Sequence, residues 1–226
     1  LVGNDVPGSS LYNTACVYGG ITNTLDDCGN ANSAMDITPT DDKGVAALGA
    51  SYDFGDGWTA AFGYEGGGDT AGKLMTKEGF DTYGLQVSYE EEDGQWGASL
   101  AYALEETSST AETTYWGLNG YWTPEDVGAV PSISVGYETG NPSSGTDTTH
   151  YFVGFQWDEV GEGTLGAAFG TTGHIADDAD DTLIYEAFYS YPINDGMTIT
   201  PVLYLKETST TGDEHTGVMV KTSFSF

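Results

Sequence analysis

The chain of 226 residues carries 35 acidic residues against 5 lysines, which gives a formal net charge of −30. This charge excludes nucleic acid as a partner, because binding to phosphates depends on Lys and Arg side chains. The length suits a single domain, and the 33 glycines and 15 tyrosines favour strands and turns over helices.

The first 44 residues precede the regular pattern of the chain and contain its two cysteines, Cys16 and Cys28. No second cysteine pair or nearby histidine accompanies them, which argues against a zinc site. A disulfide between them is favoured over two free thiols, and it would imply an oxidising compartment.

From residue 45 onward, apolar residues recur at every second position in about eleven runs, separated by clusters of Gly, Asp, Asn and Ser. For example, Leu100 and Tyr102 alternate with Ser99 and Ala101. Successive side chains of a strand point to opposite faces, so each run has one apolar row and one row of small or acidic residues. The pattern predicts an all-β chain with about eleven strands.

Two features favour a membrane barrel over a soluble β-sandwich, whose inward rows would also be apolar. Aromatic residues lie at both ends of the apolar rows, as two girdles at headgroup level would. Short and long connections also alternate, as between periplasmic turns and external loops: 55–57 is short, 67–79 is long, and 106–113 is longer than 91–94. The predicted girdle residues are Trp58, Tyr64, Tyr83, Tyr89, Trp96, Tyr102, Trp116, Trp122, Trp157 and Phe226.

The last run alternates Val220 and Phe224 with Lys221 and ends the chain on Phe226, which is typical of outer-membrane barrels. No run of about eighteen apolar residues exists, so a transmembrane helix is excluded. We therefore predict a transmembrane antiparallel up-and-down β-barrel over residues 45–226.

Counting the strands back from the C-terminus places the short connections on the periplasmic side. Residues 1–44 then form an external loop segment or fold into the lumen, and the pattern does not choose between these positions. Bacterial single-chain barrels close with an even number of strands. Either residues 1–44 hold a further strand or the chain is the C-terminal part of a longer barrel protein, and we favour the second interpretation.

The stretch LVGNDVP at 1–7, the loop between Cys16 and Cys28, the hairpin YDFGDGW at 52–58 and the final SFSF together resemble cyanobacterial outer-membrane porins. These form the iron-uptake porin family, related to the carbohydrate-selective porins. The resemblance covers essentially the whole chain. It implies a barrel of about sixteen strands, preceded by a secretion signal and a wall-binding domain. It also implies passage of inorganic ions, including iron, and the wider porin analogy implies a homotrimer.

Acidic residues that share the parity of the small row are predicted to face a water-filled lumen. Rings of carboxylates favour cations in a pore, although residues near strand ends can also serve only to solvate the mouths. Lys206 and Lys221 are the basic residues predicted to face the same lumen. The predicted acidic pore-lining residues are Asp53, Glu65, Glu90, Glu105, Glu138, Asp158 and Glu186.

Signatures of catalysis or metal binding are weak. The DFG letters at 53–55 lack the loops of a kinase and are interpreted as a hairpin. His150, His174 and His215 map to the external side, where solvated loop histidines are favoured over a metal site. The acidic run at 177–181 likewise favours a solvated loop over a Ca²⁺ site. We expect no catalytic residue, no metal and no cofactor.

These observations predict a passive porin in the outer membrane of a Gram-negative-type bacterium, a cyanobacterium by the resemblance. Small solutes and inorganic ions would cross an acidic lumen that favours cations. The expected partners are outer-membrane lipid and the permeating solutes, without nucleic acid. Two alternatives stay open: a soluble acidic β-barrel or sandwich that binds carbohydrate, and a plugged barrel that acts as a surface anchor or receptor.

Overall fold

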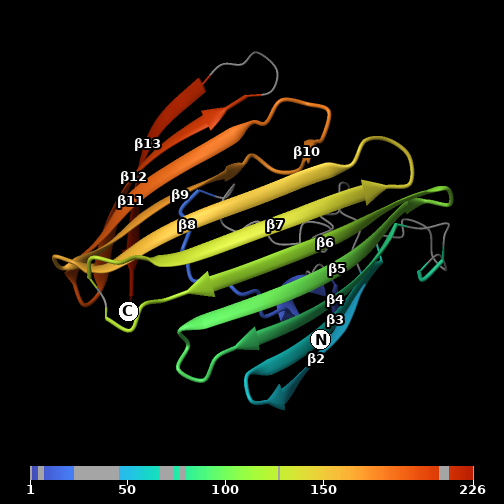
Figure 1. Cartoon of the computed structure of the whole chain (residues 1–226), viewed down its shortest axis with the longest axis horizontal. Helices are drawn as coiled ribbons and strands as arrows, with labels where there is room; N and C mark the ends of the chain where they lie inside the picture. The colour runs from blue at the N-terminus through green and yellow to red at the C-terminus, as the bar shows by residue number, and fades with distance from the viewer. Residues whose placement is uncertain are drawn as a thin grey trace.

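In the computed structural model, the described residues form one curved antiparallel sheet (Figure 1). These residues are 2–4, 8–22, 46–66, 74–76, 80–126, 128–208 and 214–225. Two short strands and one 3-10 turn accompany the long strands: β1 (Val2–Asn4), β10 (Ile175–Ala176) and η1 (Gly8–Leu11). The long strands are β2 (Ala46–Gly55), β3 (Trp58–Gly66), β4 (Asp81–Glu90), β5 (Trp96–Ser108), β6 (Ala111–Trp122), β7 (Ser132–Pro142), β8 (Thr148–Val160), β9 (Gly163–Thr171), β11 (Leu183–Asn194), β12 (Met197–Glu207) and β13 (Glu214–Phe224).

The strands follow one another in chain order, and each long strand pairs antiparallel with the next. The predicted all-β up-and-down fold is therefore confirmed, and the alternating runs correspond to the long strands. The alternation did not reveal β1, which pairs with β2, or β10, which pairs with β8. Among the described residues, β1 and β13 each pair with one neighbour, so the sheet is open.

None of the helical residues that the structure describes forms a helix long and apolar enough to cross a bilayer.

The two rows of each strand face opposite sides of the sheet. Where β4 pairs with β5, Val87 stands beside Leu100 and Ser88 stands beside Ser99. The apolar row points outward, where Leu100 is 49 % exposed and Leu118 on β6 is 56 % exposed, whereas both serines are buried. A soluble sandwich would bury the apolar row, so the arrangement is the reverse of that alternative. Further exposed members of the outer row are Leu48, Leu85, Val135, Leu165, Leu203, Val218 and Val220.

The connection predicted at 106–113 is shorter than expected. β5 and β6 continue through most of it, with Glu106 beside Glu112 and Ser108 beside Ala111, so only residues 109–110 form the turn. The polar and acidic residues of this stretch predicted a loop. A strand can nevertheless extend beyond its apolar row when its backbone hydrogen bonds to the neighbouring strand continue. The described connections 143–147 and 172–182 lie at the same end of the sheet as this turn (Figure 1).

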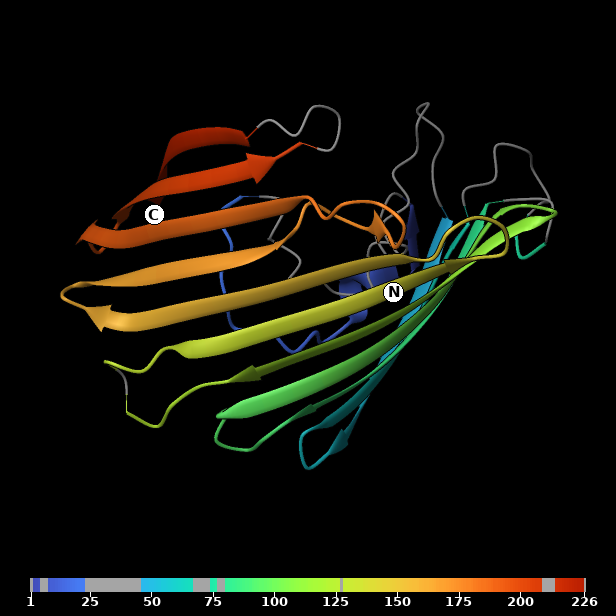
Figure 2. The ribbon, with the colours of Figure 1, turned by 45° about the horizontal axis from the view of Figure 1, so that its top comes forward.

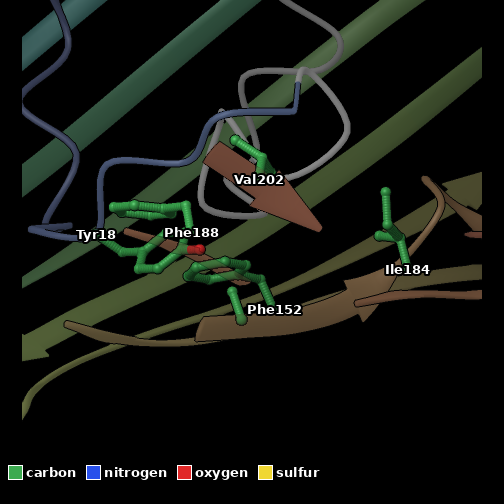
Figure 3. Packing of buried hydrophobic residues seen from close by; sticks show 6 residues of the cluster. Tyr18, Phe152, Ile184, Phe188 and Val202 are labelled. Atoms are coloured by element: carbon green, nitrogen blue, oxygen red, sulfur yellow. The ribbon is translucent and has the colours of Figure 1, made fainter. Parts of the chain in front are cut away.

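Residues 8–22, the described part of the N-terminal segment that follows β1, lie on the concave side of the sheet (Figure 2). Beneath them, the inner rows of β8, β11 and β12 carry Phe152, Ile184, Phe188 and Val202, all of which are buried. These residues form one cluster with Tyr18, whose ring lies between the strands and the segment (Figure 3). The sequence had predicted small or acidic residues on this face, so the cluster is a departure from the expected pattern.

Candidate functional site

The concave face is the candidate site, because it gathers acidic and small polar residues away from the exposed apolar row. Register assigns the inner-row carboxylates to two levels. Asp53, Glu90 and Asp158 lie at the end with the short turns. Glu65, Glu105, Glu138 and Glu186 lie in the half of the sheet nearer to the longer connections.

The three carboxylates at the short-turn end are partly or fully accessible. Asp53 is exposed and accepts a hydrogen bond from the Gly55 N–H at 2.8 Å, which fixes the β2–β3 turn. Asp158 is half-buried and accepts hydrogen bonds from Gln156 and Thr164, each at 3.2 Å. Glu90 is exposed. Accessible carboxylates of this kind can act on a passing ion through their charge.

The carboxylates in the half of the sheet nearer to the longer connections are more buried and contact other residues of the protein. Glu65 and Glu105 flank Thr82 across three strands. Glu65 is 1 % exposed, and Glu105 is half-buried and accepts a hydrogen bond from the Tyr115 hydroxyl at 3.1 Å. Burial, and next the charge of Glu65, raise the pKa of Tyr12, so this phenol stays protonated beside the carboxylate.

Glu138 faces a pair of histidines. His174 Nε2 lies 2.9 Å from Glu138 Oε1, close enough for an ion pair when the ring is protonated but without hydrogen-bond geometry. The His174 ring stacks on His150 with 5.8 Å between centroids. The Thr148 hydroxyl forms a hydrogen bond with Nδ1 of His174, at 2.9 Å between the two atoms. No group of three or more His, Cys, Asp or Glu side chains within the described ranges could hold a metal ion.

Glu186 on β11 is 3 % exposed and is occupied by the N-terminal segment. Its carboxylate accepts hydrogen bonds from the Tyr18 hydroxyl at 2.9 Å, the Ile21 N–H at 3.0 Å and the Thr22 N–H at 2.5 Å. Burial, and next the charge of Glu186, raise the pKa of Tyr18. This predicted pore-lining carboxylate therefore binds Tyr18, Ile21 and Thr22 of the described stretch 12–22, which we call the strap.

The strap crosses the inner row almost from one side of the sheet to the other. Its Ala15 N–H donates to Ser99 on β5 at 3.0 Å, and its Val17 N–H donates to Ser134 on β7 at 3.0 Å. The Gly19 N–H donates to Gln156 on β8 at 3.4 Å. Sequence reasoning assigned Ser99 to a water-facing row and overlooked the role of all three side chains in binding the strap. The large apolar residues on the inner row of β8 and β11 were the signal that something covers this face.

Lys206 and Lys221 share the concave face, but the structure does not bring them together. Lys206 stands beside His215 near one end of the β12–β13 pair, and Lys221 stands beside Thr200 six residues further along β12. Lys206 is half-buried and Lys221 is exposed.

Eight of the ten predicted girdle residues are half-buried or exposed on the outer face of the sheet. At the short-turn end, Tyr89 lies 5.0 Å from Trp58 and 4.9 Å from Trp96 between ring centroids, which gives a continuous aromatic band over β3, β4 and β5. Exposed rings are Trp58, Trp96, Trp116 and Trp122, and half-buried rings are Tyr83, Tyr89, Tyr102 and Trp157.

Tyr64 differs from this band because it is only 2 % exposed. Its hydroxyl donates to Asp81 at 2.6 Å and accepts the Met75 N–H at 3.0 Å, so residues of the β3–β4 connection cover the ring. Phe226 lies outside the described residues. Cys28 also lies outside them, so the disulfide with Cys16 stays a prediction.

Comparison with known proteins identifies one family and two similar solved structures. A family model described as Gram-negative porin matches residues 3–212. Two solved structures are similar at low identity. A KdgM porin has 12 % identity and a TM-score of 0.41, with 82 % of this chain and 94 % of that chain covered. A KdgM porin in complex with disordered oligogalacturonate has 12 % identity and a TM-score of 0.39, with 81 % and 93 % covered. No curated protein matches the chain.

Proposed function

The chain belongs to the Gram-negative porin family, and from this premise we propose that it is a passive diffusion channel whose acidic concave face favours small solutes and inorganic cations. Diffusion through such a channel needs no covalent step and no energy source. The protein contributes a passage of limited width and a fixed electric field. Membership of the family makes the chain an outer-membrane porin.

The observation that supports the proposal best is the exposure of large apolar side chains on the outer face of the sheet. Leu100 and Leu118 are about half exposed, and the aromatic band around Tyr89 lies at one end of the same face. Lipid tails satisfy such a surface, and headgroups suit the rings. The concave face is then the side that water can reach.

The cation preference rests on the carboxylates of the concave face. The inner row contains seven predicted acidic residues against Lys206 and Lys221, and the whole chain has a net charge of −30. Asp53, Glu90, Glu105 and Asp158 are exposed or half-buried, so they are the members of this set best placed to attract a permeating cation.

A reversal-potential measurement in a KCl gradient tests this preference. We expect the wild type to favour K⁺, and the variant E90Q/E105Q/D158N to move the reversal potential toward zero because three accessible charges are lost. The matched control is E92Q/D93N/D195N, which removes the same charge from exposed turn residues. An equal shift in both variants, or no shift in either, would contradict the proposal that these carboxylates set the preference.

The resemblance supports finer proposals of the same kind. We propose that iron is among the transported ions, that the source is cyanobacterial, and that three copies assemble as a trimer. Uptake of radioactive iron by proteoliposomes, compared with empty liposomes, tests the first. Mass measurement in detergent tests the third, with a monomer as the contrary result.

A plugged barrel that acts as an anchor or receptor is the second candidate. The specific observation in its favour is the strap, which lies on the concave face and covers part of the inner row. Planar bilayers separate the two candidates: discrete conductance steps support a channel, and the absence of steps at protein levels that insert into the membrane supports the plugged form.

A further inference from the structure

We propose that the strap is a fixed constriction of the channel and that Glu186 is the positioning residue that holds it in place. The inference rests on the proposed channel function and adds to it the element that limits the passage. It also assigns Glu186 a role different from that of the accessible carboxylates.

The first step is the way in which Glu186 binds the strap. A buried carboxylate is stable when hydrogen-bond donors satisfy its oxygens, and charge-assisted hydrogen bonds are the strongest of their class. Oε1 receives the Tyr18 hydroxyl and the Ile21 N–H, and Oε2 receives the Thr22 N–H. Its charge is therefore used within the protein, and little of it faces a permeating ion.

The second step is the apolar surface beneath the strap. The Tyr18 ring lies 5.5 Å from the Phe152 ring and 5.8 Å from the Phe188 ring, measured between centroids (Figure 3). Gly154 makes room for the Tyr18 ring, because a Cβ atom at Gly154 would lie 2.7 Å from Cγ of Tyr18. Exposing this apolar surface to water would be unfavourable, so its burial holds the strap against the sheet.

The third step is the direction of the strap. Its hydrogen bonds reach Ser99 on β5, Ser134 on β7, Gln156 on β8 and then Glu186 on β11. The strap therefore runs across the strands rather than along one of them. A segment in this position takes up part of the cross-section of any passage on the concave side of the sheet.

Two variants weaken the strap by different routes. E186Q replaces one carboxylate oxygen by an NH2 group, which cannot accept a hydrogen bond, so at least one donor of the strap loses its acceptor. G154A introduces a methyl group where the Tyr18 ring packs and changes no charge. G120A is the matched glycine control, since the nearest atom to its Cβ would be 3.5 Å away, and D195N is the matched charge control in an exposed turn.

Single-channel recording and liposome swelling with sugars of increasing size are the measurements. We expect E186Q and G154A to increase the conductance step and to admit larger sugars, with the reversal potential in a KCl gradient unchanged. G120A and D195N should match the wild type. Agreement between E186Q and G154A guards against a folding defect in either one.

Other outcomes separate this inference from the proposed function. A conducting wild type with both variants unchanged overturns the inference alone, and so does a shift in reversal potential without a change in conductance. A silent wild type with conducting variants overturns the open channel but supports the strap as its obstruction. Silence of all the proteins overturns both.

Discussion

Tyr18 and Glu186 are 168 residues apart in the chain, and the phenol hydroxyl donates a hydrogen bond to the carboxylate at 2.9 Å. The pair joins the strap to β11, and Tyr18 is itself a member of the buried cluster on the concave face. This contact links two segments that are far apart in the sequence, in a way that no local pattern reveals.

Removal of the Tyr18 hydroxyl tests the strength of this link. The variant Y18F keeps the ring against Phe152 and Phe188 but loses the donor to Glu186. Because a hydrogen bond to a charged group contributes about 1.5–3 kcal/mol, we expect the free energy of unfolding to fall by about that amount. Urea unfolding in detergent, followed by tryptophan fluorescence, measures the change. Y18A should cost more, since it also removes the buried ring.

Alkaline pH should lower the stability of the folded protein in part through the Tyr18 hydroxyl. The pKa of Tyr18 is raised by burial, and next by the charge of Glu186, above the ordinary value of 10.0 that it regains in the unfolded chain. The protonated phenol is therefore favoured in the folded state. Its stabilising contribution is fully present below pH 10 and decreases as the pH rises above 10. The fall in unfolding midpoint between pH 9 and pH 11 should be smaller in Y18F than in the wild type, and equal falls would contradict the argument.

A charged side chain introduced on the outer face should lower the stability of the folded protein in the membrane, and by more the deeper it lies in the bilayer. Leu118 lies within β6 beside Leu100 and Tyr137 on the neighbouring strands, whereas Val160 ends β8 at a turn. An Arg at the bilayer midplane costs about 2–4 kcal/mol and one near the interface about 0–1 kcal/mol. We expect L118R to lower the free energy of folding into lipid vesicles far more than V160R. Equal effects would mean that this face does not contact hydrocarbon.

Two glycines in the short turns, Gly57 and Gly94, should differ in how much stability is lost when each is replaced by alanine. Gly57 has φ +82°, and a Cβ there would lie 1.9 Å from the Glu90 carbonyl oxygen, whereas Gly94 has φ +70° and open space. G94A should cost about 1–2 kcal/mol for the left-handed conformation alone. G57A should cost more, because the backbone of β4 must also move. Thermal unfolding of the two variants measures the difference.

The predicted disulfide has a direct test by mass. Cys16 lies in the strap, and Cys28 lies outside the described residues. If the two are bridged, alkylation of the denatured protein without reductant should label neither, and reduction before alkylation should label both. One labelled cysteine without reductant would contradict the bridge.

The sequence predicted the fold because strand alternation is local. Ser99 and Leu100 point to opposite faces whatever the rest of the chain does, so alternation separated the two rows. The aromatic residues at the row ends and the alternating lengths of the connections then placed the apolar row outside. The contacts of the inner row could not be predicted in the same way. Ser99 and Glu186 are polar residues that would suit contact with water, yet both bind the strap. Their partners lie in a distant segment of the chain, so the local sequence does not reveal these contacts. Alternation also gave no sign that residues of the β3–β4 connection would cover Tyr64.

The strap is held chiefly through its main chain. Six backbone N–H groups between Ala15 and Thr22 donate to side chains of the sheet, while the Tyr18 side chain supplies the hydroxyl contact and the buried ring. Every residue except proline carries such a donor, so amino-acid changes at Val17 or Thr22 leave the hold on the segment intact. The amino-acid identities that these contacts require are therefore those of the receiving side chains in the sheet, together with Tyr18.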